Sequence, residues 1–77
     1  MGPMSNKNAD RRRYRIETCA GVVWGHYAAT DDAAKAATYY HEARRTGYRT
    51  RVIDRSGTRL SLTHGTRGEV LWCVVPE

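Results

Sequence analysis

Two side chains with catalytic chemistry, Cys19 and His26, lie in the segment CAGVVWGH. A cysteine nucleophile needs a nearby histidine that accepts its proton and a third side chain that orients the imidazole. A hairpin would bring Cys19 and His26 face to face, but no Asn or Asp is placed to orient this histidine. We therefore predict no catalytic residues and no enzyme activity, with Cys19 as a packed thiol and His26 as a half-exposed imidazole.

Patterns that bind metal or phosphate are also missing. A structural zinc site takes about four ligands in closely spaced pairs, whereas this chain has two separate cysteines and three scattered histidines. The segment HGTRG (64–68) lacks the lysine and the spacing of a P-loop, and no helical pattern follows it. We predict no metal ligands and no cofactor.

The elements that position these residues follow from hydrophobic periodicity, and the first of them form a hairpin. YRIETC (14–19) alternates apolar and polar residues, as a strand with one buried face does. VVWGHYAA (22–29) is rich in β-branched and aromatic residues, which favour strands. Gly21 can take the positive φ of a tight turn between them.

Residues 31–47, DDAAKAATYYHEARRTG, predict a helix. Thr30 and Asp31 are the N-cap candidates, Asp31 and Asp32 would place negative charge in the first turn, and Gly47 is a C-terminal stop. At about 100° per residue, one face is mostly alanine, which lets the helix lie close to a sheet. The residues of that face are Ala33, Ala36, Ala37, Tyr40 and Ala43.

Three further strand patterns complete the chain. In TRLSLT (58–63), Leu60 and Leu62 should point inward. The segment EVLWCVV (69–75) is apolar on both faces, so it should lie inside the sheet or have its second face covered. The order ββαβββ predicts an α+β fold: a single, mostly antiparallel sheet with one helix packed on one face. The strand segments are YRTRVID (48–54), TRLSLT (58–63) and EVLWCVV (69–75), separated by the turn DRSG (54–57) and the loop HGTRG.

The length of 77 residues predicts one domain. Residues 1–11 are polar and predict a flexible tail, in which Gly-Pro before a second Met suggests an expression remnant at residues 1–3. Residues 12–77 then form the single small domain. Leu, Ile and Val number eleven and Phe is absent, so the core is thin. Such a core indicates either a modest stability or a homodimer that shares its core.

The absence of any apolar run of 18 residues predicts a protein with no membrane partner. Two cysteines are too few for a disulfide scaffold. We therefore expect Cys19 and Cys73 to be buried free thiols, as in a cytoplasmic protein.

The net charge is +5, and arginine outnumbers lysine by eleven to two. Arg11, Arg12 and Arg13 form a basic arm before the first strand. If Ile16, Val52, Leu60 and Leu62 face the helix, the period of two puts Arg15, Arg51 and Arg59 together on the helix-free face. One of Trp24 and Tyr27 should join them there, because odd and even positions of a strand point in opposite directions.

A basic sheet face with an aromatic residue is the layout that binds single-stranded nucleic acid. We therefore predict a small, non-enzymatic binding module that contacts nucleic acid or an acidic surface of a nucleoprotein complex. In this hypothesis Arg15, Arg51 and Arg59 hold phosphates and Trp24 or Tyr27 stacks on a base. Arg12 and Arg13 extend the contact. The plainer interpretation, a solvated face kept soluble by arginine, is equally consistent with the pattern.

A protein-targeting role is the alternative. Arg, Trp and Tyr are common hot spots of protein interfaces, and accessory proteins of phages and mobile elements are often small domains without catalytic residues. The alternative is therefore an inhibitor of a host nucleoprotein machine, a class that includes the anti-CRISPR proteins. No recognised nucleic-acid motif decides between the two, since the chain lacks an RNP pattern, a GXXG clamp and a helix-turn-helix.

Overall fold

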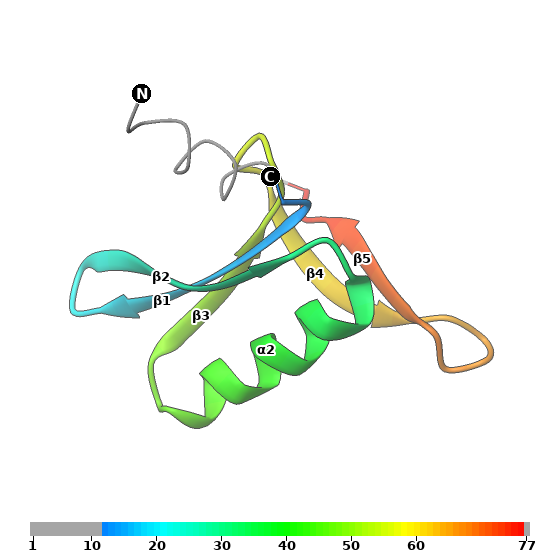
Figure 1. Ribbon diagram of the computed structural model, residues 1–77, viewed down its shortest axis with the longest axis horizontal. Coiled ribbons are helices and arrows are strands. Elements are labelled where there is room, and N and C mark those ends of the chain that lie inside the picture. The colour runs from blue at the N-terminus through cyan, green and yellow to red at the C-terminus, as the bar shows by residue number, and fades with distance from the viewer. Residues whose placement is uncertain (1–11, 77) are drawn as a thin grey trace.

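The computed structural model describes residues 12–76 and has an α+β fold (Figure 1). The tail predicted for residues 1–11, including Arg11, lies outside the described residues. All described strand pairs are antiparallel. The predicted order ββαβββ is confirmed. The elements are β1 (Tyr14–Ala20), β2 (Val23–Thr30), α2 (Ala33–Arg45), β3 (Arg49–Ile53), β4 (Arg59–His64) and β5 (Val70–Val74).

The five strands form one sheet in the order β2-β1-β3-β4-β5. β2 and β3 both flank β1 and are antiparallel to it, so they run parallel to each other and α2 is the crossover between them. α2 packs on one face of the sheet and contacts β1, β2, β3 and β5. The opposite face is free of any described helix.

The helix begins one residue later than the N-cap candidates predicted. Asp32 is the N-cap, and its Oδ1 accepts hydrogen bonds from the amides of Ala34 and Lys35 at 2.8 and 3.2 Å. Thr30 is not the N-cap but binds the residue that is, since its Oγ1 accepts a hydrogen bond from the Asp32 amide. The first turn therefore contains no acidic residue, contrary to the sequence expectation. Gly47 has φ +89°, in agreement with the predicted C-terminal stop.

The core between α2 and the sheet is small. Ile16 and Val52 are the largest fully buried side chains, and they pack against Ala36 and Ala43 of the helix. The predicted alanine face is thus the buried face, and its lack of side-chain bulk lets the helix lie close to the strands. Leu60 packs at the border of this cluster, on the helix-facing side as predicted.

An aromatic cluster extends this core towards β5. The Trp72 ring lies 6.0 Å from the Tyr14 ring and 5.9 Å, edge to face, from the Tyr40 ring, between centroids. Trp72 Nε1 also donates a hydrogen bond to the carbonyl of Ala33 at 3.0 Å. One side chain therefore anchors β5 to both the first turn of the helix and the first strand.

The sheet divides into two wings. The first wing is β2, β1 and β3, the second wing is β4 and β5, and they pair at only two positions, Val52–Leu60 and Ile53–Arg59. Figure 1 shows the wings diverging, with α2 between them. Because Tyr14 of β1 touches Trp72 of β5 across two intervening strands, the sheet curls around the helix. Its helix-free face is consequently convex.

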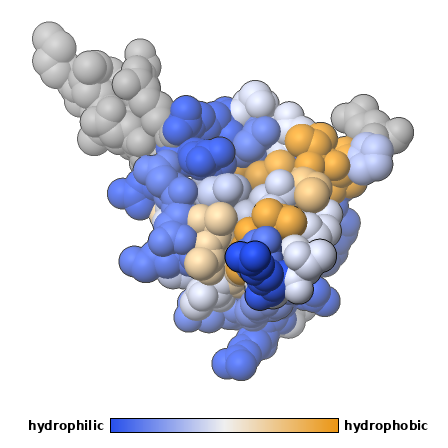
Figure 2. All heavy atoms as spheres, turned by 90° about the vertical axis from the view of Figure 1, so that its right-hand side faces the viewer, coloured by the Kyte–Doolittle hydropathy of each residue, from blue (hydrophilic) through white to orange (hydrophobic). Residues whose placement is uncertain are grey.

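The position of β5 corrects two expectations. β5 is an edge strand that pairs with β4, so it does not lie inside the sheet. Leu71 and Val74 are 44% and 61% exposed, and Cys73 is an exposed rather than a buried thiol. Figure 2 shows apolar surface on this side of the molecule, the right-hand side of Figure 1. Cys19 is buried, as expected.

Candidate functional site

The strand register places Arg15, Arg51 and Arg59 on the helix-free face. Arg15 is paired with Ile53, and Ile53 with Arg59, so these residues share one side of the sheet. Arg51 is two residues before Ile53 on the same strand and therefore has the same orientation. The spatial arrangement predicted from the period of two agrees with the register. A fourth arginine, Arg49, lies on the same face, because it is two residues before Arg51 on β3.

Two of these arginines bind a carboxylate that sequence reasoning overlooked. Glu17 is paired with Arg51 across β1 and β3, and its Oε1 accepts a 2.8 Å hydrogen bond from Arg51 Nε. Arg51 Nη2 lies 2.7 Å from the same oxygen, and Arg15 Nη1 lies 3.4 Å from Oε2. Glu17 is 8% exposed. A buried carboxylate between two guanidinium groups partly neutralises this half of the face.

Trp24 completes this arrangement, which we call the Glu17 network (Arg15, Glu17, Trp24 and Arg51). Cys19 is two residues after Glu17 on β1 and therefore points to the helix-free face. Trp24 is opposite Cys19 and lies on the same face. The guanidinium carbon of Arg51 is 4.2 Å from the centroid of its indole ring, and that of Arg49 is 5.8 Å away. The stacked guanidinium group of Arg51 already contacts the ring that was predicted to stack on a base.

Tyr27 reaches the same face by a different route. The register of β1 and β2 shifts between Ile16 and Glu17: Ile16 is opposite Ala28, but Glu17 is opposite His26, which leaves Tyr27 as the extra residue of a bulge. Counting back from Ala28, which faces the helix, places Tyr27 on the helix-free side. The rule that only one of the two aromatics can lie there therefore fails, because a bulge breaks the alternation on which it depends.

Arg12 and Arg13 are attached to the end of β2 rather than projecting as a separate arm. Arg12 Nη1 donates a 2.9 Å hydrogen bond to the carbonyl of Ala29. The amide of Arg13 donates to Asp31 Oδ1 at 2.8 Å, and its guanidinium carbon lies 5.8 Å from the Tyr14 ring centroid. The part of the predicted basic arm that the structure describes therefore lies against the end of β2. Both side chains belong to the first wing.

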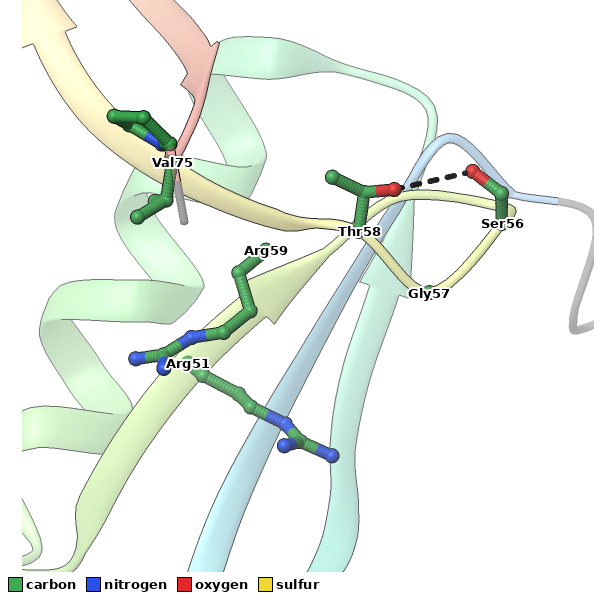
Figure 3. Close-up of a pocket in the computed structure, with 7 residues that line it drawn as sticks. Arg51, Ser56, Gly57, Thr58, Arg59 and Val75 are labelled. Carbon is green, nitrogen blue, oxygen red and sulfur yellow. Dashed lines mark hydrogen bonds between the residues drawn. The ribbon is translucent and has the colours of Figure 1, made fainter.

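Arg59 differs from Arg51 in its surroundings. It lines a depression of about 450 Å³ at the junction of the two wings, which we call the Arg59 pocket. In Figure 3 the side chains of Arg51 and Arg59 extend in opposite directions, Arg51 towards β1 and β2. No described acidic side chain lies within salt-bridge distance of Arg59. The pocket is lined by Arg51, Ser56, Gly57, Thr58, Arg59, Val75 and Pro76.

The wall of the Arg59 pocket is a hydrogen-bonded turn. Asp54 Oδ1 accepts hydrogen bonds from the amides of Ser56 and Thr58, both at 2.9 Å, and from the Ser56 hydroxyl. These bonds lower the pKa of Asp54 below its ordinary value of 3.8, with the Thr58 amide as the largest cause. The amide of Gly57 donates to the Asp54 carbonyl, which closes the predicted turn at 54–57. The hydroxyls of Ser56 and Thr58 are thus held at the rim, beside an arginine.

The residues considered as catalytic or metal-binding candidates form no bonded pair or cluster within residues 12–76. Cys19 is opposite Trp24, not His26, and its Sγ donates to the carbonyl of Gly21 at 3.2 Å. His26 is opposite Glu17 and is exposed. Among residues 12–76, no group of three or more His, Cys, Asp and Glu side chains is placed to hold a metal ion.

Sequence reasoning missed Glu17 and Arg49, although both had a signal. Glu17 is two residues after Arg15, and Arg49 is two residues before Arg51. The alternation that put Arg15 and Arg51 on the helix-free face applies equally to these neighbours. Their effect depends on the pairing of β1 with β3, which periodicity does not specify.

No family model matches this chain, and no curated protein or solved structure is significantly similar to it. The part of the chain that the structure describes contains no helix of the length and apolarity needed to cross a membrane.

Proposed function

We propose that the protein binds single-stranded nucleic acid across the helix-free face of its sheet. The observation that carries this proposal is the charge of that face. The described strands project one carboxylate, Glu17, from it, together with all of their arginines: Arg15, Arg49, Arg51 and Arg59. Arginine is rarely buried beneath a helix, so the presence of all four arginines on the uncovered face is expected in itself. The shortage of acidic partners is what favours a polyanionic ligand.

Arg59 and Arg49 are the main phosphate contacts in this proposal. Both are exposed, whereas the half-buried guanidinium group of Arg51 is held by Glu17 and Trp24. The hydroxyl of Thr58 lines the same pocket as Arg59 and can donate to a phosphate oxygen, whereas the Ser56 hydroxyl donates to Asp54. The convex curvature favours a flexible single strand, which can follow a face that bends away on both sides.

Fluorescence anisotropy with labelled oligo(dT) and oligo(rU) tests this proposal. The wild-type protein should bind both at low salt, and the logarithm of the affinity should fall with the logarithm of salt with a slope of about −0.7 per phosphate contact. Arg59→Ala should reduce that slope by about one contact and weaken binding to both sequences. Unlabelled duplex DNA should compete less well than the unlabelled single strand.

Arg45→Ala is the matched control, since Arg45 is an exposed arginine on α2, across the sheet from the proposed site. It removes the same charge and should change the slope less than Arg59→Ala. Equal losses in the two variants would show that binding follows net charge alone, which contradicts a defined face. Absence of binding at low salt, together with a stoichiometric complex with an acidic protein, would replace this proposal with the protein-targeting alternative.

A further inference from the structure

The outer edge of β5 carries unpaired backbone groups. Within residues 12–76, β5 is hydrogen-bonded to β4 and to no other strand. The Val75 amide donates to the Arg59 carbonyl at 3.0 Å, which sets the alternation of the β4–β5 ladder. Leu71 and Cys73 therefore direct their backbone groups towards β4. Val70, Trp72 and Val74 direct theirs away from it.

This edge lacks the features that usually prevent strands from pairing between molecules. The sequence of β5, VLWCV, contains no charged residue and no proline, and two of its side chains, Leu71 and Val74, are well exposed. The opposite edge of the sheet is different, because β2 contains Gly25 and the bulge at Tyr27. Charges, prolines and bulges are the means by which edge strands avoid association.

We propose that β5 pairs with β5 of a second copy of this chain, antiparallel and centred on Trp72. Only residues that direct their backbone groups outward can form the new ladder, namely Val70, Trp72 and Val74. Placing Trp72 opposite Trp72 of the second copy also places Val70 opposite Val74, so all three residues are paired. A shift by two residues in either direction leaves only two pairs. The strand is thus complementary to itself in one preferred register.

The side chains fit this register as well as the backbone does. Val74, 61% exposed in the single chain, would lie beside Val70 of the second copy, and Leu71, 44% exposed, beside Cys73 of the second copy. All of these contacts are apolar. The pairing would reduce the exposed apolar surface on the side of the molecule shown in Figure 2.

The symmetry of this pairing determines what the dimer presents. Two antiparallel strands in one sheet are related by a twofold axis perpendicular to that sheet, so each face continues as the same face in the second copy. The result is a sheet of ten strands, five from each copy. Both helices lie on one face and both sets of arginines on the other. The inference itself depends on the β5 edge and stands independently of nucleic-acid binding.

Light scattering coupled to size-exclusion chromatography tests the dimer. At about 100 µM, the wild-type mass should be twice the chain mass of 8.7 kDa and should fall towards it on dilution. Val74→Lys should give the single-chain mass, because a charge would be buried at the new ladder. Val23→Lys is the control: Val23 is 67% exposed on the opposite edge strand, and this variant should remain dimeric. Matching urea midpoints would show that both variants are folded.

Disulfide trapping tests the register. Leu71 and Cys73 of the second copy would form a non-hydrogen-bonded pair, with Cα atoms about 4.5 Å apart, within the range that a disulfide spans. Leu71→Cys, with the native Cys73 present, should therefore form a covalent dimer on mild oxidation. The double variant Leu71→Cys, Cys73→Ser should not, because its only cysteine on this strand would be opposite a serine.

Three results would overturn the proposal. The first is a wild-type protein of single-chain mass at about 100 µM. If that protein dimerises only after removal of residues 1–11, the β5 edge would be the binding site of that segment. The second is a dimer that survives Val74→Lys. The third is equal cross-linking of the single and double cysteine variants, which would exclude this register.

Discussion

The two wings of the sheet differ in how deeply their side chains are buried. The first wing supplies both of the largest fully buried side chains, Ile16 and Val52, and two of its arginines, Arg15 and Arg51, are bonded to Glu17. The second wing contributes Leu60 and Trp72, which are only partly buried. It also carries Arg59, without a described carboxylate partner, and the open apolar edge of β5. The most deeply buried side chains thus lie in the first wing, and the apolar edge of β5 lies in the second.

The difference shows how a thin core is accommodated. The three strands of the first wing pair with one another and pack against α2, and the Glu17 network adds ionic contacts between β1 and β3. The second wing is a hairpin attached through two residue pairs and anchored by Trp72. A two-stranded hairpin is only marginally stable alone. Arg59 has no carboxylate partner within residues 12–76, and the outer edge of β5 has no partner strand there, which is consistent with contacts outside the chain.

The largest expected effect comes from a core truncation in the first wing. Ile16→Ala should lower the free energy of unfolding by about 2–4 kcal/mol, because Ile16 is fully buried and its loss leaves a cavity against α2. Leu71→Ala in the second wing should cost below about 1 kcal/mol in the monomer, since Leu71 is 44% exposed. Urea unfolding of both variants at low protein concentration measures the difference. Similar losses would contradict the division between the wings.

Removal of the Glu17 carboxylate should have an intermediate effect. Glu17→Gln should cost about 1–3 kcal/mol, because a charge-assisted hydrogen bond in a buried site is lost and Arg51 keeps its charge. The same variant should bind single-stranded nucleic acid more tightly, since it raises the positive charge of the face. Stability and affinity should therefore change in opposite directions.

Glu42→Gln is the control for this variant, because Glu42 is an exposed carboxylate on α2. Its stability should remain within about 0.5 kcal/mol of the wild type. Urea unfolding and anisotropy of the two variants under the same conditions give the comparison. If Glu17→Gln is as stable as Glu42→Gln, the Glu17 network does not stabilise the first wing.

The smallest effect concerns the turn at the junction of the wings. Hydrogen bonds from the Thr58 amide and the Ser56 hydroxyl lower the pKa of Asp54 below 3.8 in the folded protein. The stability from these bonds is therefore present above the unfolded-state pKa and is lost as pH falls through the lowered folded-state pKa. Urea midpoints measured from about pH 6 to about pH 2.5 should fall less steeply for Asp54→Asn than for the wild type. Parallel profiles would show that the carboxylate charge does not stabilise this turn.

Local patterns were sufficient to predict the elements and the side of the sheet on which most residues lie. Alternation in residues 58–63 correctly placed Leu60 towards the helix and Arg59 away from it. The alanine spacing of residues 33–43 identified the buried face of α2. These predictions succeed because side-chain direction repeats with the backbone geometry of a single element. A bulge is the exception, since one extra residue at Tyr27 reverses the alternation.

Strand order was not predictable in the same way. EVLWCVV is apolar on both faces, which is typical of an interior strand, yet β5 lies at the edge. Apolar residues indicate that a strand is to be buried, but they do not specify by what. Pairing with a second chain is as consistent with the pattern as burial within one sheet. The exposed position of Cys73 follows from the same fact.

The sequence by itself determined the α+β class, the helix with its alanine face, and the common side of Arg15, Arg51 and Arg59, because each depends on the period of one helix or strand. The tertiary structure alone decided that Glu17 binds Arg51, that Trp24 is stacked by the same arginine, and that Arg59 is left available. These three facts depend on which strands are neighbours and in what register. Long-range pairing brings together residues as distant as Glu17 and Arg51, 34 positions apart, and no local pattern encodes it.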